Sequence, residues 1–344
     1  MFFLVCGHSL PKTYIYNTMK RKNLTTGLIA ILLLFSLFLL RNFEPIRMRK
    51  QDFGDIRLQK IEETTTETPY LIRFFDGETL VAMPLEEYVF CVVAAEMPAS
   101  YESAALEAQA IAARTYTLYK SLHGGCKKYE GADICGVSGH CQAFADLERL
   151  TDRWGEDFPY YEKKIREAVE KTSGMVLCYE NEPINALYHA SSSGTTENVE
   201  NVYSTALPYL VSVDTPEEAK SEVKITKTEL MQLMQANYKG FTLGNMDEIA
   251  VLEHNSTGRV EKLRIGNVTM SGKTARKIFS LKSTDFEVKI ENGILVFFAQ
   301  GYGHGVGMSQ KGANILAKDG FTAKEILLHY YSGVEINNID QIKK

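Results

Sequence analysis

The stretch from Leu85 to Lys120 constrains the fold of this 344-residue chain more than any other part of its sequence. Apolar side chains recur at spacings of three and four between Leu85 and Val93, which predicts a helix with one buried stripe. Pro98 disfavours helical geometry at Met97, so the chain must turn there. An alanine-rich second helix is predicted from about Ser103 to Ser121. Two helices that meet at a corner therefore form the predicted centre of the fold.

Glu96 ends the buried stripe of the first helix, four residues after Val92 and among small or apolar neighbours. Burial disfavours the charged form of a carboxyl, and so does the negative end of a helix dipole. Both effects raise its pKa, as a general acid that works near neutral pH requires. Two alternatives stay open for Glu96: an exposed glutamate at a helix end, or a buried one whose charge is satisfied by Arg114.

An uncharged apolar run occupies residues 24–40 with the sequence LTTGLIAILLLFSLFLL. At about 1.5 Å of rise per residue, this run just reaches across the hydrocarbon core of a bilayer. A cleaved signal peptide is the competing interpretation because basic residues precede the run, but no small-x-small cleavage site follows it. We therefore expect a cytoplasmic N-terminus at 1–23, a transmembrane anchor at 24–40 and a polar linker at 41–68.

The composition of the whole chain is that of a globular protein, with 45% hydrophobic and 24% charged residues and a net charge of −5. No basic cluster is interleaved with aromatic residues, so nucleic acid is excluded as an expected partner.

An insert at 123–141 gathers cysteine and histidine in the order H-x2-C-x8-C-x4-H-C. Thiolate and imidazole ligands suit zinc in a closed tetrahedral site, so we expect a structural zinc rather than a catalytic one. A disulfide within the insert, or unpaired thiols, remain alternatives, although three cysteines leave one over from a single bridge. The preferred ligands are Cys126, Cys135, His140 and Cys141, with His123 as the substitute.

Two later segments carry polar side chains in glycine-containing loops. Tyr188-His189 ends a predicted strand and leads into a run of hydroxyl residues, which suits the binding of sugar hydroxyls; plain turn-forming serines are the alternative. No G-x-S-x-G turn accompanies them, so a Ser–His hydrolase is not indicated. The second segment, 301–310, surrounds His304 with glycines that let the backbone approach a ligand or another chain segment closely. A structural role for His304 is its alternative.

Six segments in this order make the chain resemble the stage II sporulation protein D family of peptidoglycan lytic transglycosylases: PLEEYV, VVAAEMPAS, EAQAIAARTYTLY, ALYHASSSGTTENVENVY, LPYLVSV and GYGHGVGMSQKGAN. The resemblance runs from about Pro69 to Gly333. In that family the glutamate before Met-Pro is the catalytic acid/base, and Glu96 alone has that context here. Catalysis in the family needs no cofactor, so the Cys/His insert would be an elaboration of it.

The resemblance also implies which residues contact substrate. These expected substrate contacts come from the second helix and the two polar segments: Arg114, Tyr188, His189, Ser192, Ser193, Tyr203, His304, Ser309 and Gln310.

The expected fold is α+β, with mixed helices and antiparallel strands in a two-lobed domain around a central substrate cleft, preceded by one N-terminal transmembrane helix. The domain would occupy residues 69–344, with a smaller lobe at about 214–282.

The expected activity is cleavage of the MurNAc–GlcNAc bond of glycan strands stripped of stem peptides, which leaves 1,6-anhydroMurNAc ends. The resemblance places this activity in septal and engulfment cell-wall remodelling during sporulation, with other engulfment proteins, including an amidase, as partners. It also implies a single-pass protein of the mother-cell membrane with its catalytic domain outside the cytoplasm. A non-catalytic peptidoglycan-binding module and a zinc-dependent amidase or peptidase are the alternatives.

Overall fold

The computed structural model of this protein describes residues 70–137 and 139–342. The chain divides into two units, 1–68 and 69–344, and the predicted cytoplasmic segment, anchor and linker all lie outside the described residues. Within 70–137 and 139–342, no helix is both long and apolar enough to cross a membrane. The expected fold is therefore corrected for the described residues: they are α+β, and the transmembrane helix and single-pass location that we expected find no support among them.

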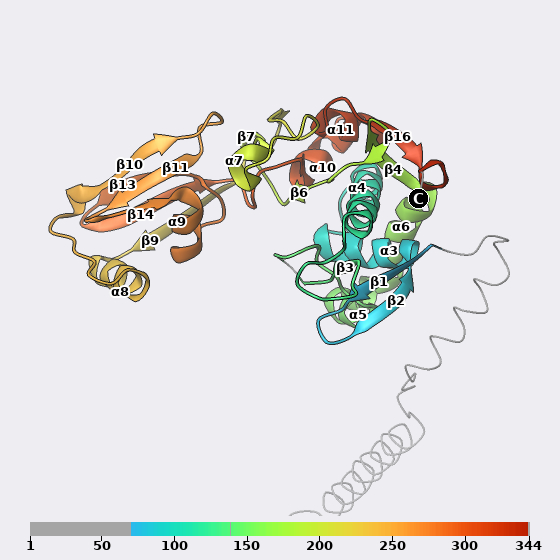
Figure 1. Ribbon diagram of the computed structural model, residues 1–344, viewed down its shortest axis with the longest axis horizontal. Coiled ribbons are helices and arrows are strands. Elements are labelled where there is room, and N and C mark those ends of the chain that lie inside the picture. The colour runs from blue at the N-terminus through green and yellow to red at the C-terminus, as the bar shows by residue number, and fades with distance from the viewer. Residues whose placement is uncertain (1–69, 138, 343–344) are drawn as a thin grey trace, which may run out of the picture. The chain divides into compact units, whose positions relative to one another are not determined.

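Helix α4 (Ser103–Leu122) is the central element of the larger lobe (Figure 1). Its alanine-rich sequence lets neighbouring elements approach closely on several sides, and most of its residues are buried. It packs against α3 (Leu85–Glu96), α6 (Phe158–Lys171), α10 (Gln310–Lys318) and α11 (Ala323–Tyr330). The two helices predicted around the Met97-Pro98 corner are confirmed.

The first described residues of the larger lobe form part of a small three-stranded sheet. Strands β1 (Leu71–Phe75) and β2 (Leu80–Pro84) form the antiparallel hairpin that the alternating apolar residues predict, and β3 (Ile134–Cys135) pairs parallel with β1. This parallel pairing attaches the Cys/His insert to the sheet. Helices α5 (Leu147–Trp154) and η1 (Gly155–Asp157) follow the insert and lead into α6.

A second sheet has the strand order β16-β4-β5, formed by Glu335–Asn338, Met175–Tyr179 and Glu182–Pro183. The sequence pattern predicts that the strand after the turn at 181–183 continues through Leu187, which is wrong. Only Glu182–Pro183 pairs with β4, because backbone bonds from Ala186 to Ile184 and from Leu187 to Asn185 close tight turns. The short helix η3 (Ile339–Gln341) follows β16.

The two polar segments meet in a parallel pair of short strands, β6 (Tyr188–His189) and β15 (Met308–Ser309). This pairing brings residues that are more than a hundred positions apart in sequence to one place. The next two strands along the chain, β7 (Gly194–Thr195) and β8 (Asp214–Thr215), pair antiparallel with each other. Helix α7 (Val199–Tyr203) lies between them in sequence.

The smaller lobe has its own hydrophobic core, built from residues between Ile225 and Ala299. One sheet has the order β13-β14-β9 and the other β10-β11-β12, and helices α8 and α9 belong to the same lobe (Figure 1). The alternation of apolar residues on both sides of Asn292-Gly293 predicts a hairpin with a type I′ turn, and the structure confirms this hairpin, with positive φ at both turn residues. Because β14 pairs with β9, this hairpin belongs to the smaller lobe, which therefore extends beyond the boundary expected at about residue 282.

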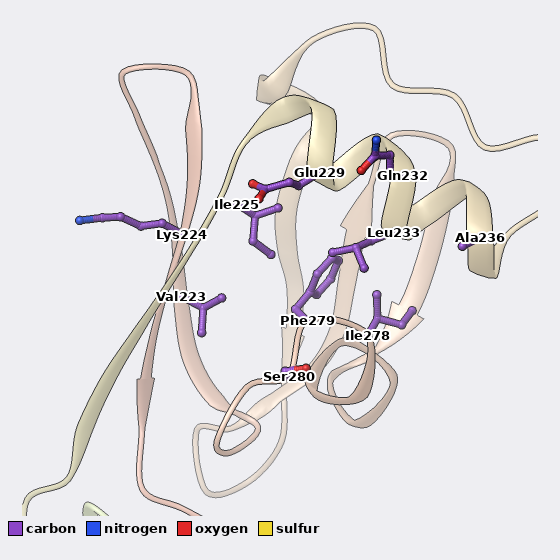
Figure 2. A pocket seen from close by; sticks show the side chains of 10 residues that line it. All are labelled: Val223, Lys224, Ile225, Glu229, Gln232, Leu233, Ala236, Ile278, Phe279 and Ser280. Atoms are coloured by element: carbon purple, nitrogen blue, oxygen red, sulfur yellow. The ribbon is translucent and has the colours of Figure 1, made fainter.

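The elements of the smaller lobe have these bounds: β9 Lys220–Ile225, α8 Lys227–Asn237, η2 Met246–Glu248, β10 Ile249–His254, β11 Val260–Ile265, β12 Val268–Ser271, α9 Gly272–Ile278, β13 Asp285–Glu291 and β14 Ile294–Gln300. A pocket of about 460 Å³ lies between α8, β9 and the end of α9, with Phe279 and Leu233 among its apolar lining residues (Figure 2). None of the residues expected to act in catalysis or substrate binding lines this pocket.

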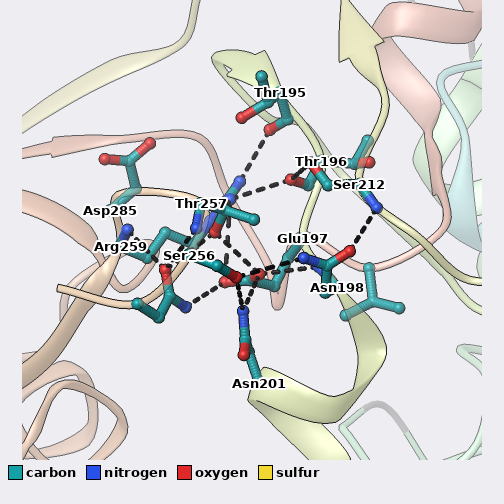
Figure 3. A network of polar contacts seen from close by, with 12 residues as sticks. Thr195, Thr196, Glu197, Asn198, Asn201, Ser212, Ser256, Thr257, Arg259 and Asp285 are labelled. Atoms are coloured by element: carbon teal, nitrogen blue, oxygen red, sulfur yellow. Dashed lines mark hydrogen bonds and ion pairs between the residues drawn. The ribbon is translucent and has the colours of Figure 1, made fainter. Parts of the chain in front are cut away.

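A buried polar network joins the smaller lobe to the segment after β7 (Figure 3). The carboxylate of Glu197 accepts hydrogen bonds from Asn255 Nδ2 at 2.7 Å and Thr257 Oγ1 at 2.8 Å. Arg259 lies 3.9 Å from the same carboxylate and donates to the carbonyl oxygen of Thr195 at 2.8 Å. Because Glu197 and Arg259 are both buried, the network fixes where the smaller lobe meets β7.

Candidate functional site

Glu96 is the last residue of α3, and its carboxyl group is half-buried. Its Oε1 atom accepts a hydrogen bond of 2.6 Å from the backbone amide of Ala143. Burial raises the pKa of Glu96, while the Ala143 amide and the side chain of Gln310 oppose that rise by hydrogen bonding. No second carboxylate of the described residues is among the groups that set this pKa. The carboxyl therefore holds its proton more tightly than an exposed glutamate does, and the backbone fixes one of its oxygens.

Tyr188 lies close to this carboxyl. Burial raises the pKa of its phenol well above the ordinary value, and the charge of Glu96 raises it further. The phenol donates to Gln142 Oε1 at 2.7 Å, and Gln142 Nε2 donates to Thr117 Oγ1 at 3.0 Å. Gln142 precedes Ala143, so one segment of chain positions both the phenol and the carboxyl.

His189 lies inside the protein, beside the start of the serine run. Its Nε2 atom is 2.6 Å from Ser192 Oγ, and its Nδ1 atom is 3.2 Å from the carbonyl oxygen of Val306. Burial lowers the pKa of His189 well below its ordinary value, and His304 and Arg259 lower it further. The imidazole is therefore neutral at physiological pH.

Glu217 is a buried carboxylate that sequence reasoning missed. It accepts hydrogen bonds from the Ser192 amide at 2.7 Å, from Ser309 Oγ and from Thr215 Oγ1. The carboxylate of Glu217 connects the two polar segments, because Ser192 and Ser309 donate to the same oxygen atom, Oε1. No local pattern separates Glu217 from the charged residues around it in sequence, since its partners come from three different strands or loops.

His304 lies between His189 and Tyr203, with ring centroids 5.8 Å and 6.0 Å away respectively. Its Nδ1 atom accepts a hydrogen bond of 3.1 Å from the Val306 amide, so the ring proton is on Nε2. Burial lowers the pKa of His304 to about 4, and the charge of Arg276 contributes to the same shift. Tyr203 has half of its surface exposed, and its ring is turned edge-on to His304.

The other expected substrate contacts differ in their accessibility. Ser193 Oγ donates to Gln300 Oε1 at 3.0 Å, whereas Ser309 caps α10 and Gln310 donates to Gln109 Oε1 at 3.3 Å. Ser309 and Gln310 are both buried, so they face the protein interior around Glu96 and Glu217.

Arg114 is separated from this group. Its side chain is fully buried in α4 and makes two hydrogen bonds to the carboxylate of Glu86, at 2.9 Å and 2.6 Å. A third bond of 3.1 Å goes to the carbonyl oxygen of Met175. Arg114 therefore joins α3, α4 and β4, and it neither neutralises Glu96 nor presents a donor to a ligand.

The cysteine and histidine residues expected to bind metal gather in one group, in which all four ligand atoms lie within 4.8 Å of one another: Cys126, Cys135, His140 and Cys141. The Nδ1 atom of His140 lies 3.5 Å, 3.2 Å and 3.3 Å from the sulfurs of Cys126, Cys135 and Cys141. His123, the expected substitute, is elsewhere: it stacks on Tyr119 and its Nδ1 contacts the Tyr119 carbonyl oxygen at 2.8 Å.

These distances fit a tetrahedral thiolate and imidazole site. Zinc bonds of about 2.3 Å to sulfur and about 2.0 Å to nitrogen place neighbouring ligand atoms roughly 3.5–3.8 Å apart. The cysteines of the group are free thiols rather than a disulfide, and the sulfurs of Cys126 and Cys141 are 4.0 Å apart. Apolar and aromatic side chains, including Phe75 and Tyr129, pack around the group.

The Cys/His group and Glu96 are connected through three consecutive residues. Cys141 is one member of the group, Gln142 holds the phenol of Tyr188, and Ala143 donates its amide to Glu96. The position of the insert therefore sets two contacts of the site, although the sequence pattern alone does not show this connection.

The fold and the site define an α+β protein whose larger lobe holds a half-buried glutamate, Glu96, beside a half-buried tyrosine and two neutral histidines.

Comparison with known proteins gives the family. Residues 77–179 match the model of the stage II sporulation protein family. The chain is 35% identical to stage II sporulation protein D of Bacillus amyloliquefaciens, over 81% of this chain and 82% of the relative. It is 36% identical to stage II sporulation protein D of Bacillus subtilis (strain 168), over 77% of each. The chain therefore belongs to the stage II sporulation protein D family.

A more distant relative carries a different name. The amidase enhancer of Bacillus subtilis (strain 168) is 25% identical over 72% of this chain and 40% of its own length.

Proposed function

We propose that this protein is a peptidoglycan lytic transglycosylase in which Glu96 is the only catalytic acid/base. The observation that carries the proposal is the half-buried carboxyl of Glu96, whose pKa is raised and which has no second carboxylate beside it among the groups that set that pKa. Hydrolysis at a sugar usually employs two carboxylates at a defined separation. A single acid suffices when a hydroxyl of the substrate itself is the nucleophile.

The reaction has two proton transfers at Glu96. The protonated carboxyl donates its proton to the glycosidic oxygen between MurNAc and GlcNAc, and the bond from C1 of MurNAc to that oxygen breaks. The C6 hydroxyl of MurNAc then attacks C1 while the Glu96 carboxylate takes the hydroxyl proton. The products are a 1,6-anhydroMurNAc end and a free GlcNAc hydroxyl, and the carboxyl is protonated again.

Tyr188 and His189 orient the sugar beside Glu96 in this proposal. Both are neutral at physiological pH, since burial raises the pKa of the phenol and lowers that of the imidazole. The phenol oxygen of Tyr188 donates to Gln142 and can still accept a hydrogen bond from a sugar hydroxyl. Both ring nitrogens of His189 are hydrogen-bonded inside the protein, so His189 acts by positioning the loop that meets the sugar, and neither group holds a charge next to the acid. The site therefore stabilises the oxocarbenium-like transition state by positioning rather than by a second carboxylate.

The Cys/His group is proposed to bind a structural zinc ion, because its four ligand atoms have the donor chemistry and spacing of a closed site. A bound ion would hold the insert and, through Gln142 and Ala143, the segment that contacts Glu96. Metal analysis of the purified protein checks this: about one zinc per chain is expected, and a Cys135→Ser variant should lose it. A wild-type protein purified without chelator and free of zinc would contradict the proposal.

The proposed substrate is a glycan strand stripped of its stem peptides, and the proposed setting is cell-wall remodelling during engulfment. Membership in the sporulation family supports the setting, and the relative named amidase enhancer supports cooperation with an amidase.

Product analysis tests the activity directly. The purified full chain and its Glu96→Gln variant are incubated with denuded glycan strands, and the products are identified by mass. We expect anhydro-ended sugars from the wild type and none from the variant. Reducing-end products would mean that water is the nucleophile, and the single-acid mechanism would then be wrong.

Two rival functions predict different results. A glycan-binding module would bind the strands without cleaving them and would retain its function in the Glu96→Gln variant. A zinc amidase would release peptides from intact peptidoglycan and would lose all activity as soon as metal is removed. The proposed enzyme would lose activity after metal removal only to the extent that it unfolds.

A further inference from the structure

A second group of side chains borders the site on the side of His304 and has no role in the mechanism above. Tyr203 and Tyr302 are 51% and 50% exposed, although both lie next to buried parts of the site. Arg276 of α9 lies close enough to both phenols, and to His304, for their charges to affect one another. Lys282 lies over the ring of Tyr302, with its Nζ atom 4.6 Å from the ring centroid.

The guanidinium of Arg276 is held in place by α9. Lys273, one turn earlier on the same face, donates to the carbonyl oxygen of Val202 at 2.6 Å, which fixes α9 against the end of α7. Tyr203 follows Val202 directly, so this bond also sets the distance between Arg276 and Tyr203. The Nε atom of Arg276 donates to the carbonyl oxygen of Leu281 at 3.4 Å, and within the described residues its two terminal nitrogens make no hydrogen bond or ion pair.

Tyr302 is held by backbone hydrogen bonds to other segments of the chain. Its backbone forms a two-way bridge with Ser191, with bonds of 2.6 Å and 3.0 Å, and the next amide donates to the carbonyl oxygen of Lys282. Gly303 has a φ of +123°, and a Cβ at this position would lie 2.8 Å from the Cβ of His189. The close approach of Tyr302 to the site therefore depends on glycine at 303.

Arg276 differs in its partners from three other arginines that are buried or half-buried. Arg114 and Arg166 form ion pairs with glutamates at 2.6 Å and 2.9 Å, and Arg259 lies 3.9 Å from Glu197. In the described part of the chain, Arg276 has no ion pair with any carboxylate, although it is half-buried. A half-buried guanidinium without an internal carboxylate is suited to a carboxylate from a ligand, which it can bind through two parallel hydrogen bonds.

The two tyrosines supply the complementary surface. An exposed aromatic ring presents a flat apolar face with a polar tip, and such a face packs against the C–H side of a sugar ring. The charge of Lys282 adds to that of Arg276 at the same place. Two half-exposed aromatic rings beside two cations therefore match a sugar that carries a negative charge.

We propose that Arg276, Lys282, Tyr203 and Tyr302 form a subsite for an acidic sugar, in which the guanidinium of Arg276 binds the free lactyl carboxylate of a MurNAc residue. This inference rests on the proposed function, because it takes the glycan strand as the ligand. A lactyl group joined to a peptide is an amide without negative charge, so this subsite would select strands whose peptides have been removed.

Binding measurements test the subsite without any need for catalysis. The Glu96→Gln full chain and its Arg276→Gln derivative are titrated with denuded glycan strands, and with the same strands after their lactyl carboxylates are converted to amides. We expect the Glu96→Gln protein to bind the carboxylate strands at least about tenfold more tightly, as for a charged hydrogen bond. Arg276→Gln should remove this preference.

Two further variants control for charge and folding. Lys277→Gln removes the same charge from an exposed neighbour on α9 and should keep the preference. Arg276→Lys retains the positive charge but lacks the planar guanidinium group, so it should keep only part of the preference for carboxylate strands. A preference that survives Arg276→Gln, equal binding of both strands by the Glu96→Gln protein, or no binding of either strand would overturn the subsite.

The two proposals can fail separately. Anhydro products from wild type together with equal binding of both strands would leave the transglycosylase standing and refute the subsite. A preference that depends on Arg276 without any cleavage by the wild type would refute the transglycosylase and support the subsite in a binding protein.

Discussion

Glu96 and Glu197 are both held inside the protein by hydrogen bonds, but they are held in different ways. Glu96 is half-buried, accepts one backbone amide at 2.6 Å and has a glutamine nearby. Glu197 is only 1% exposed and accepts bonds from Asn198, Asn201, Asn255 and Thr257, with Arg259 close by (Figure 3).

The two carboxyls differ most in the number of hydrogen-bond donors around them, because Glu197, the more buried of the two, has the donors and the nearby guanidinium that Glu96 lacks. A carboxylate surrounded by donors from two lobes joins those lobes, and exchange of its proton has no part in that role. A carboxyl with few donors in a poorly solvated place holds its proton more tightly and can give it to a substrate. Glu96 is therefore suited to chemistry, and Glu197 to holding the chain together.

The largest expected effect is on the activity of Glu96→Gln. Loss of a general acid typically reduces a rate by about 10²–10⁴-fold. The free energy of unfolding should change little, because glutamine can still accept the Ala143 amide bond. Rates of anhydro-product release and urea unfolding curves of the same preparation check both parts. A variant that is inactive because it is unfolded would not support a catalytic role.

Glu197→Gln should show the reverse pattern. Glutamine keeps one acceptor oxygen but leaves Arg259 buried without its counter-charge, so we expect a loss of about 3 kcal/mol in the free energy of unfolding. Activity per folded molecule should remain measurable at low temperature. If Glu197→Gln is as stable as the wild type, the network is not what joins the lobes.

Metal removal should lower the melting temperature before it lowers activity. Chelation, or a Cys141→Ser substitution, removes the proposed tie that holds the segment leading to Ala143. Thermal unfolding and product release, measured on the same samples, separate the two effects. Cys178→Ser is a matched control, because this buried cysteine lies outside the group. Immediate loss of activity at full stability would instead indicate a catalytic metal.

The pH dependence of stability should reveal the raised pKa of Glu96. Since the folded state binds this proton more tightly than the unfolded state, stability falls as pH rises from the ordinary value of 4.5 through the raised value. Relative to Glu96→Gln, the wild type should therefore lose free energy of unfolding as pH rises through that window. At higher pH the difference between the two proteins should stay constant. Urea unfolding at a series of pH values measures the difference. A constant difference from pH 4 upward would contradict a raised pKa.

The pH dependence that His304 contributes to stability has the opposite sign. Because burial lowers its pKa from 6.5 to about 4, the unfolded chain takes up a proton in this range before the folded chain does. The stability that His304 contributes is thus present above pH 6.5 and is lost as pH falls toward 4. An NMR titration should find the ring neutral at pH 6. A ring that titrates near 6.5 would mean that solvent reaches it.

Local patterns predicted several elements correctly because their causes are local. The spacing of apolar residues from Leu85 to Val93, Pro98 at the corner and Asn292-Gly293 at the turn each act within a few positions. The strand predicted through Leu187 failed because the periodicity of its side chains could not show that only two residues find a pairing partner.

The sequence by itself determined the two helices around Glu96, the cysteine and histidine residues that gather in one group, and the family to which the chain belongs. Each depends on residues close in sequence or on a long pattern of similarity. Only the tertiary structure decided that Arg114 pairs with Glu86, that Glu217 links Ser192 to Ser309, and that Lys273 of α9 bonds to the residue before Tyr203. Those contacts arise where separate strands and lobes pack together, and a charged residue's partner there depends on geometry that sequence spacing does not contain.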